Sequence, residues 1–314
     1  MLGADNMALR SSVMTATRRQ FLKRSLAMCA ALDAACWTSV VMAQNISSRR
    51  QRLSDIIREY SAQGSHRTGT DVDNLSAHWM VERLAAMSVI AQLDAFELRR
   101  ADVQAGSAAV VEDERREPTT AFNVSVRIAG RDPTLPPVVI MTPRSALWYA
   151  ASERGGGIAA FLEIAYALSA QQAARDVIFI AHSGHEIGQL GLKHFFHQHA
   201  GLVNQAAVWI DLGDNFAARD TLVRLQYSDY ELEELTELVL ASHRLIPGIK
   251  TPIGSVPMGD VRQVFEGGGH FVSLMGSNRL YQHPDDRWPD AVDIENTYRW
   301  VEALTALAQA LANH

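Results

Sequence analysis

Apolar positions along the chain follow two periodicities, and together these predict an α/β fold. Continuous apolar runs at residues 137–141, 177–181 and 206–210 predict buried strands, because a strand covered on both faces is apolar at successive positions. Residues 123–128 instead alternate between apolar and polar side chains, which is typical of an outer strand with one face exposed to solvent.

Other segments repeat their apolar residues at helical spacing. The first of them follows Asn74, which we expect to act as its N-cap. Because strands and helices alternate, we expect a mostly parallel central sheet with helices on both faces, in one domain over residues 44–314. The charged connection over residues 98–121 is too short for an inserted lid domain. The predicted helices are residues 75–87, 158–168, 193–199, 231–243 and 293–311.

The N-terminal segment resembles a twin-arginine export signal. Two arginines stand in residues 17–23 (TRRQFLK), and residues 25–43 are mostly apolar and end in small side chains, which predicts cleavage after residue 43. The apolar segment is short and carries Asp33, so a stable membrane anchor is not expected. We predict a periplasmic or secreted protein. The alternatives are a basic tail on a cytoplasmic protein and a lipoprotein modified at Cys36.

Composition narrows the partners and the chemistry of any site. The chain has 314 residues, a net charge of −6, and 47% hydrophobic residues, as an ordinary globular protein has. It has no extended basic segment, so a small molecule or peptide is the expected partner and nucleic acid is not. Cys29 and Cys36 both fall in the predicted signal, so any metal site must use His, Asp or Glu.

Polar residues gather in four segments that follow predicted strands or precede the last helix. In a parallel sheet, ligands bind at the carboxyl ends of the strands, where the connecting loops converge. We therefore expect the functional site at this edge of the sheet. The four segments are residues 142–157, 183–191, 211–215 and 281–293.

The order and spacing of these segments resemble peptidase family M28, the co-catalytic zinc aminopeptidases and glutaminyl cyclases. The resemblance covers most of residues 55–312. It is carried by residues 64–70 (GSHRTGT), 152–160 (SERGGGIAA), 184–191 (GHEIGQLG) and 209–211 (WID). It implies two zinc ions held by two histidines, two aspartates and one glutamate, with a second glutamate as general base.

Most positions that the resemblance assigns to metal ligands carry other residues here. Thr142 stands at the first histidine, Glu153 at the bridging aspartate and Gln282 at the final histidine, while Glu186 and Asp211 are retained. The metal candidates are therefore Glu153, Glu186 and Asp211. This oxygen-rich set suits a hard cation better than zinc, so we expect no cofactor or one weakly bound divalent cation.

An intact zinc-dependent aminopeptidase that releases N-terminal amino acids is the alternative function. A one-residue shift that brings His283 into the place of Gln282, together with an inward turn of His185, would favour it. The two changes would supply two nitrogen ligands and a single metal position.

Two arginines enter the neighbourhood where zinc would otherwise neutralise the carboxylates. We hypothesise that Arg144 and Arg154 offset Glu153, Glu186 and Asp211 in a metal-free or weakly metal-dependent pocket, because a guanidinium group pairs well with carboxylates. The protein would then be an M28 peptidase-like protein with an altered active site: a hydrolase of changed chemistry or a non-peptidase ligand binder. A structural or partner-binding module is a third possibility.

His185 occupies the position that the resemblance assigns to the general base. With Glu186 beside it, His185 is the candidate acid–base group, and Arg144 and Arg154 complete the predicted catalytic set. Ser145 or Thr142 could act as a nucleophile. The predicted ligand-binding residues are Thr142, Ser145, Trp148, Gln282 and His283. The histidines left outside the predicted site are His182, His194, His197 and His199, and Gly155, Gly156 and Gly157 are assigned to close packing of a helix on a strand.

Overall fold

The computed structural model describes residues 47–98 and 119–314. The chain divides into two units, Met1–Gln51 and Arg52–His314, and the fold given below is that of the second. The predicted export signal with its boundary at residue 43, and residues 99–118 of the charged connection, lie outside the described residues. Within residues 47–98 and 119–314, no helix is both long and apolar enough to span a bilayer.

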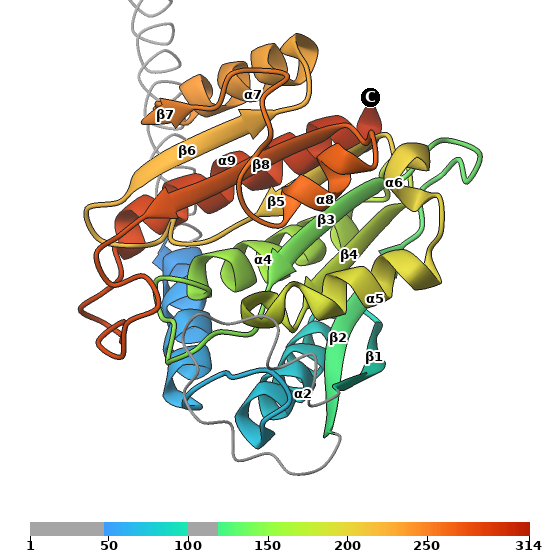
Figure 1. Ribbon diagram of the computed structural model, residues 1–314. Helices are drawn as coiled ribbons and strands as arrows, with labels where there is room; N and C mark the ends of the chain where they lie inside the picture. The colour runs from blue at the N-terminus through green and yellow to red at the C-terminus, as the bar shows by residue number, and fades with distance from the viewer. Residues whose placement is uncertain (1–46, 99–118) are drawn as a thin grey trace, which may run out of the picture. The chain divides into compact units, whose positions relative to one another are not determined.

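An eight-stranded mixed sheet organises the fold, with strand order β1-β2-β4-β3-β5-β8-β6-β7 (Figure 1). The four central strands are parallel, and antiparallel pairings join β1 to β2, β2 to β4 and β6 to β8. The predicted mostly parallel sheet is therefore confirmed, although β2 pairs on both sides and is not outermost. The strands are β1 (Ala91–Leu98), β2 (Thr119–Ile128), β3 (Val138–Pro143), β4 (Val177–His182), β5 (Val208–Leu212), β6 (Leu222–Tyr227), β7 (Ile249–Lys250) and β8 (Phe271–Ser277).

Each predicted helix is present, and most ends agree within a few residues, whereas the helices at residues 47–62, 202–205 and 261–266 were not predicted. The largest difference is in the helix predicted at residues 75–87, which begins at Asp71: the Thr70 hydroxyl accepts from the Asp73 N–H, so Thr70 is the cap. Asn74 lies inside this helix, and its predicted capping role is wrong. The helices are α2 (Asp71–Ala86), α4 (Gly155–Ala170), α5 (Leu190–Gln198), α6 (Leu202–Gln205), α7 (Tyr230–Ser242), α8 (Val261–Glu266), α9 (Ile294–Asn313) and the 3₁₀ turn η1 (His185–Ile187).

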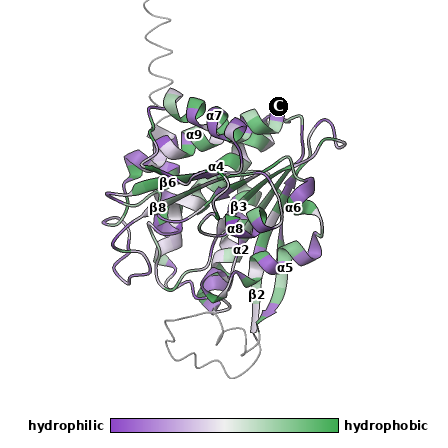
Figure 2. Cartoon of the chain, turned by 45° about the horizontal axis from the view of Figure 1, so that its top comes forward, coloured by the Kyte–Doolittle hydropathy of each residue, from purple (hydrophilic) through white to green (hydrophobic). Residues whose placement is uncertain are grey.

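Helices cover both faces of the sheet, so its central strands are buried on two sides. The side chains of α2, α4, α7 and α9 join one hydrophobic cluster, and those of α5 and α8 join another on the opposite face (Figure 1). Val138 and Ile140 belong to the first cluster, whereas Val139 and Met141 belong to the second. In Figure 2 the central strands are mostly green, as expected for strands covered on both faces. Helix α5 alternates between purple and green, as expected for a helix with one buried face.

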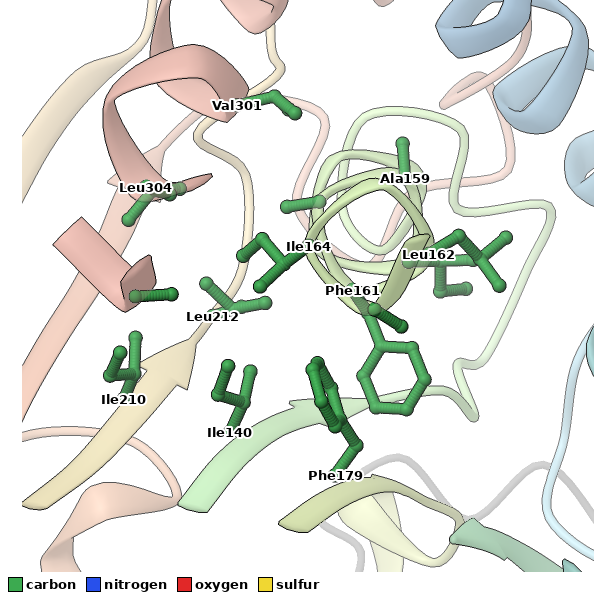
Figure 3. Close-up of a cluster of buried hydrophobic side chains, with 14 of the residues drawn as sticks. Ile140, Ala159, Phe161, Leu162, Ile164, Phe179, Ile210, Leu212, Val301 and Leu304 are labelled. Atoms are coloured by element: carbon green, nitrogen blue, oxygen red, sulfur yellow. The ribbon is translucent and has the colours of Figure 1, made fainter. Parts of the chain in front are cut away.

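Helix α4 lies directly over the middle of the sheet. Figure 3 shows Phe161 and Ile164 of α4 pointing toward Ile140, Phe179 and other side chains of the central strands. The helix approaches so closely at its first turn that a Cβ on Gly157 would collide with the Thr142 hydroxyl and a carbonyl of β5. This contact accounts for the glycine-rich start of α4 and confirms its predicted role in close packing.

A buried histidine lies next to this core. His66 has no exposed surface, its ring stacks on that of Tyr60 with 3.8 Å between centroids, and its Nε2 hydrogen-bonds to the Tyr60 carbonyl at 2.9 Å. Burial lowers the pKa of His66 to about 3. The folded protein therefore keeps this imidazole neutral at a pH where the unfolded chain would protonate it.

Stability should consequently fall as the pH drops from about 6.5, the ordinary pKa of histidine, toward 3. In this window the unfolded chain binds a proton that the folded chain excludes, which costs up to about 1.4 kcal/mol per pH unit. Urea denaturation of the protein and of His66→Gln at several pH values measures this contribution as the difference between the two slopes. His283→Gln, at a half-exposed site, is the control, and a slope unchanged in His66→Gln would contradict the prediction.

Candidate functional site

A small pocket opens at the carboxyl ends of the central strands, where the sequence predicts the functional site. It has an empty volume of about 210 Å³, part of which is open to solvent. The segments after β4 and β5 contribute to it, together with β8 and the residues just before α8. The lining residues are His185, Asp211, Gly213, Asp214, Met258, Gly259, Asp260 and Met275.

A tight turn after β4 presents His185 to this pocket. Gly184 and Gly188 flank the turn with φ values of +79° and +82°, a backbone conformation that favours glycine. The His185 N–H donates to the Ser145 hydroxyl at 3.1 Å, which ties the turn to the segment after β3. Only 12% of the His185 side chain is exposed, so its imidazole is held in a largely buried position.

The His185 ring is held by a carboxylate from a distant part of the chain. Its Nδ1 lies 3.0 and 3.1 Å from the two carboxylate oxygens of Asp260, and its Nε2 lies 3.8 Å from Asp214 Oδ2. Burial alone would lower the pKa of His185, but the charge and hydrogen bond of Asp260 and the charge of Asp214 together outweigh that effect, and the pKa rises to about 9. His185 is therefore protonated at neutral pH and is a proton donor there.

Asp260 contacts a second histidine as well. His182 Nε2 lies 3.1 Å from Asp260 Oδ2, and neither side chain is appreciably exposed. Burial would raise the pKa of Asp260, but His185 and His182 lower it well below its usual value. Asp260 is therefore a buried carboxylate that stays ionised between two imidazole rings.

These contacts correct two points of the sequence analysis. Asp260, and not the adjacent Glu186, holds His185, and His182 belongs beside the site from which the sequence analysis excluded it. Asp260 is 75 positions from His185 along the chain, and no spacing or motif in the sequence links the two residues. Asp260 is thus the functional candidate that sequence reasoning missed.

Glu186 points away from His185 and joins two loops. Its Oε1 accepts hydrogen bonds from the Thr68 N–H and the Thr68 hydroxyl, both at 2.7 Å, and its Oε2 accepts from the Ser145 hydroxyl at 2.6 Å. The Ser145 side chain has no exposed surface and its hydroxyl proton is directed at Glu186. This arrangement does not support Ser145 as a nucleophile.

Arg154 provides the positive charge that was predicted at the acidic cluster. Its guanidinium lies 3.0 Å from Glu153 Oε1 and also pairs with Asp214, while its Nε donates to the Ser145 carbonyl at 2.8 Å. Both partners and Arg154 itself are almost completely buried. Burial raises the pKa of Glu153 to about 7, although Arg154 acts in the opposite direction.

Arg144 does not reach this cluster. The prediction that Arg144 helps to offset the carboxylates of the site is therefore wrong. Its guanidinium turns toward α2, where it pairs with Asp73 at 2.7 Å and also donates to the Ser76 hydroxyl. Asp73 additionally accepts from the Ser183 hydroxyl at 2.7 Å. Arg144 and Asp73 are both fully buried, so this ion pair joins α2 to the end of β3 and has no access to a ligand.

Asp211 lies at the end of β5 and lines the pocket. One carboxylate oxygen accepts a hydrogen bond from the Ser273 hydroxyl at 2.8 Å, and the other, Oδ1, has no hydrogen-bond partner among the described residues. Burial raises the pKa of Asp211 well above its usual value, and the charge of Asp260 adds to the effect. Burial and the nearby charge thus both favour the protonated form of Asp211.

The remaining predicted ligand-binding residues do not line the pocket. The buried Thr142 hydroxyl donates to a backbone carbonyl of β5 at 2.8 Å, and the Trp148 ring lies 5.1 Å from the Arg67 guanidinium. Gln282 uses its backbone N–H to bind Glu153 at 3.1 Å. The His283 side chain is 48% exposed and lies beside an aspartate at 3.6 Å.

The residues present do not fit a zinc pair. Of the five ligand positions that the resemblance implies, Thr142 and Gln282 replace the nitrogen ligands that zinc sites usually contain. The Thr142 hydroxyl already donates to a backbone carbonyl, and both oxygens of Glu186 accept hydrogen bonds. Glu153 pairs with a guanidinium, and one Asp211 oxygen accepts a hydrogen bond from Ser273. Within the described ranges, no three or more His, Cys, Asp or Glu residues are grouped so that they could hold a metal ion.

The fold matches that of solved zinc aminopeptidases and glutaminyl cyclases. The aminopeptidase from Aneurinibacillus sp. strain AM-1 is similar with a TM-score of 0.70 and 12% identity, over 84% of this chain and 94% of that chain. The zinc aminopeptidase from Bacillus subtilis has a TM-score of 0.68 and 11% identity, over 85% of this chain and 95% of that chain. The Tannerella forsythia glutaminyl cyclase has a TM-score of 0.63 and 13% identity, over 83% of this chain and 98% of that chain.

The sequence gives a more specific assignment for the central part of the chain. Residues 135–252 match the sequence profile of peptidase family M28, so the predicted resemblance to that family is confirmed. The matched segment runs from β3 to β7 and includes His185, Arg154 and Asp211. No curated protein matches the chain by sequence.

Proposed function

We propose that this protein is an M28 peptidase-like hydrolase with an altered, metal-independent active site that acts on a small peptide or amino-acid-like amide. The observation that carries the proposal is the pairing of His185 with Asp260 at the pocket wall. This pairing keeps the imidazole protonated, so the pocket contains an acid where the resemblance implies a general base.

The charges around the pocket support this chemistry without a metal ion. His185 and Arg154 supply two positive charges beside the side chains of Asp260 and Asp214. With Nδ1 directed at Asp260, the Nε2–H of His185 is the donor available to a bound amide. It would hydrogen-bond to the carbonyl oxygen, or act as a general acid and donate its proton to the leaving nitrogen as a water molecule adds to the carbonyl carbon and the C–N bond breaks. The proton that the water releases would restore the imidazolium.

Metal content measured together with activity tests the proposal in one preparation. We expect less than stoichiometric zinc in the dialysed protein, and we expect release of nitroaniline from aminoacyl-4-nitroanilides at a rate that neither a chelator nor added zinc changes. Stoichiometric zinc that survives dialysis, together with loss of turnover on chelation, would refute the proposal and support the alternative of an intact zinc aminopeptidase.

A further inference from the structure

A buried glutamine on β6 connects the two acidic sides of the pocket. Gln226 has no exposed surface, and its side-chain amide makes four hydrogen bonds. The amide oxygen accepts from the Met258 N–H at 2.8 Å and the Thr251 hydroxyl at 3.2 Å; the amide nitrogen donates to the Met258 carbonyl at 2.9 Å and the Ser273 hydroxyl at 3.3 Å. These four bonds use the full capacity of an amide group.

The contacts with Met258 fix the loop that carries Asp260. Residues 251–260 have no helix or strand, and Gly254 and Gly259 adopt positive φ values of +84° and +79°. The Met258 side chain is 55% exposed, so burial of this side chain contributes little to the position of the loop. The paired backbone hydrogen bonds to Gln226 hold it instead, two residues before Asp260.

The contact with Ser273 extends to the opposite side of the pocket. Gln226 on β6 is paired in register with Ser273 on β8, and Ser273 is paired in register with Asp211 on β5. The side chains of the three residues therefore form a row across three neighbouring strands, which ends with the Ser273 hydroxyl donating to Asp211 at 2.8 Å. One side chain thus connects Asp211 with the loop of Asp260.

We propose that Gln226 is a positioning residue that holds the Met258–Asp260 loop against β6 and so places Asp260 on His185. The contribution of this placement to turnover rests on the proposed function of His185. The placement itself depends only on the hydrogen bonds of Gln226, and it can be measured without a substrate. Gln226 does not line the pocket. It acts through the loop that carries Asp260 and through Ser273.

The imidazole N–H signals of the full chain, recorded by ¹H–¹⁵N NMR, test this role. The Nδ1–H of His185 should give a downfield signal because it donates to a carboxylate, and His185→Gln identifies that signal by its loss. Asp260→Asn should remove or strongly shift it. In Gln226→Leu we expect the same loss or shift, because the loop is no longer held in place.

Thr251→Val is the matched control, because it removes one hydrogen bond of the same amide and leaves the bonds to Met258 and Ser273 intact. It should leave the signal unchanged. An unchanged signal in Gln226→Leu would overturn the proposal. If Gln226→Leu does not fold, Gln226→Glu replaces it: this variant keeps the acceptor for the Met258 N–H but loses the donors, so the signal should still shift, and an unmoved signal would count against the proposal.

The spectra also separate this inference from the proposed function. Loss of the signal in Gln226→Leu, together with an undiminished rate in His185→Gln, would uphold the positioning role and refute the catalytic one. An unchanged signal in Gln226→Leu, together with loss of turnover in His185→Gln, would refute the positioning role and uphold the catalytic one.

Discussion

Arg154→Met should destabilise the protein by about 3–5 kcal/mol, because it leaves two buried carboxylates without their counter-ion. The guanidinium pairs with both Glu153 and Asp214, and all three side chains are at most 6% exposed. Methionine fills a similar volume, so the loss would come from the uncompensated charge and not from a cavity. Urea denaturation at neutral pH measures the effect.

Arg262→Met is the matched control for this substitution. Arg262 pairs with Glu266 within α8, and both side chains are more than half exposed. Solvent screens such a pair, so its loss should cost less than about 1 kcal/mol. If the free energy of unfolding fell by the same small amount in both variants, Arg154 would not be the group that neutralises the acidic cluster at the pocket.

His185→Gln should reduce turnover by about 10²–10⁴-fold, the usual contribution of a positioned general acid. Glutamine retains a polar side chain of similar reach but cannot transfer a proton. Because the pKa of His185 is about 9 and its protonated form is the donor, activity should also fall as the pH rises through about 9. Below that pH the imidazole carries its proton, so the activity should not change with pH through the titration of His185.

Initial rates with an aminoacyl-4-nitroanilide between pH 6 and 10.5 measure both effects. His283→Gln, a substitution at a half-exposed histidine that does not line the pocket, should leave the rate and the profile unchanged. A rate in His185→Gln equal to that of the original protein would remove His185 from the proposed mechanism. If activity instead fell with rising pH at a pH well below 9, the essential proton would lie on a different group.

The periodicity of apolar residues was sufficient to predict the central part of the fold. Runs such as 137–141 and 177–181 became β3 and β4, because a strand between two helical layers must be apolar at successive positions. The start of α2 was misplaced, since both Thr70 and Asn74 can cap a helix and only the observed backbone distinguishes them. Four strands, β1, β6, β7 and β8, were not predicted: β1 has mixed burial and β7 has two residues.

The candidate site was predictable in its location but not in its contacts. The segments after β4 and β5 were identified because the carboxyl ends of parallel strands lie at one edge of the sheet, and they did bring His185 and Asp211 to the same pocket. The direction of a side chain is set by its neighbours in space. Arg144 and Arg154 therefore looked equivalent in the sequence, although one pairs with Asp73 and the other with Glu153 and Asp214.

The sequence by itself determined the layered α/β architecture and the resemblance to family M28, because residue type, order and periodicity are properties of the chain. The tertiary structure alone decided which charges meet. Asp260 and Gln226 lie far from His185 along the chain, and strand register and a loop joined to β6 bring them to it. Such long-range pairings arise only when the sheet forms, so local sequence patterns carry no record of them.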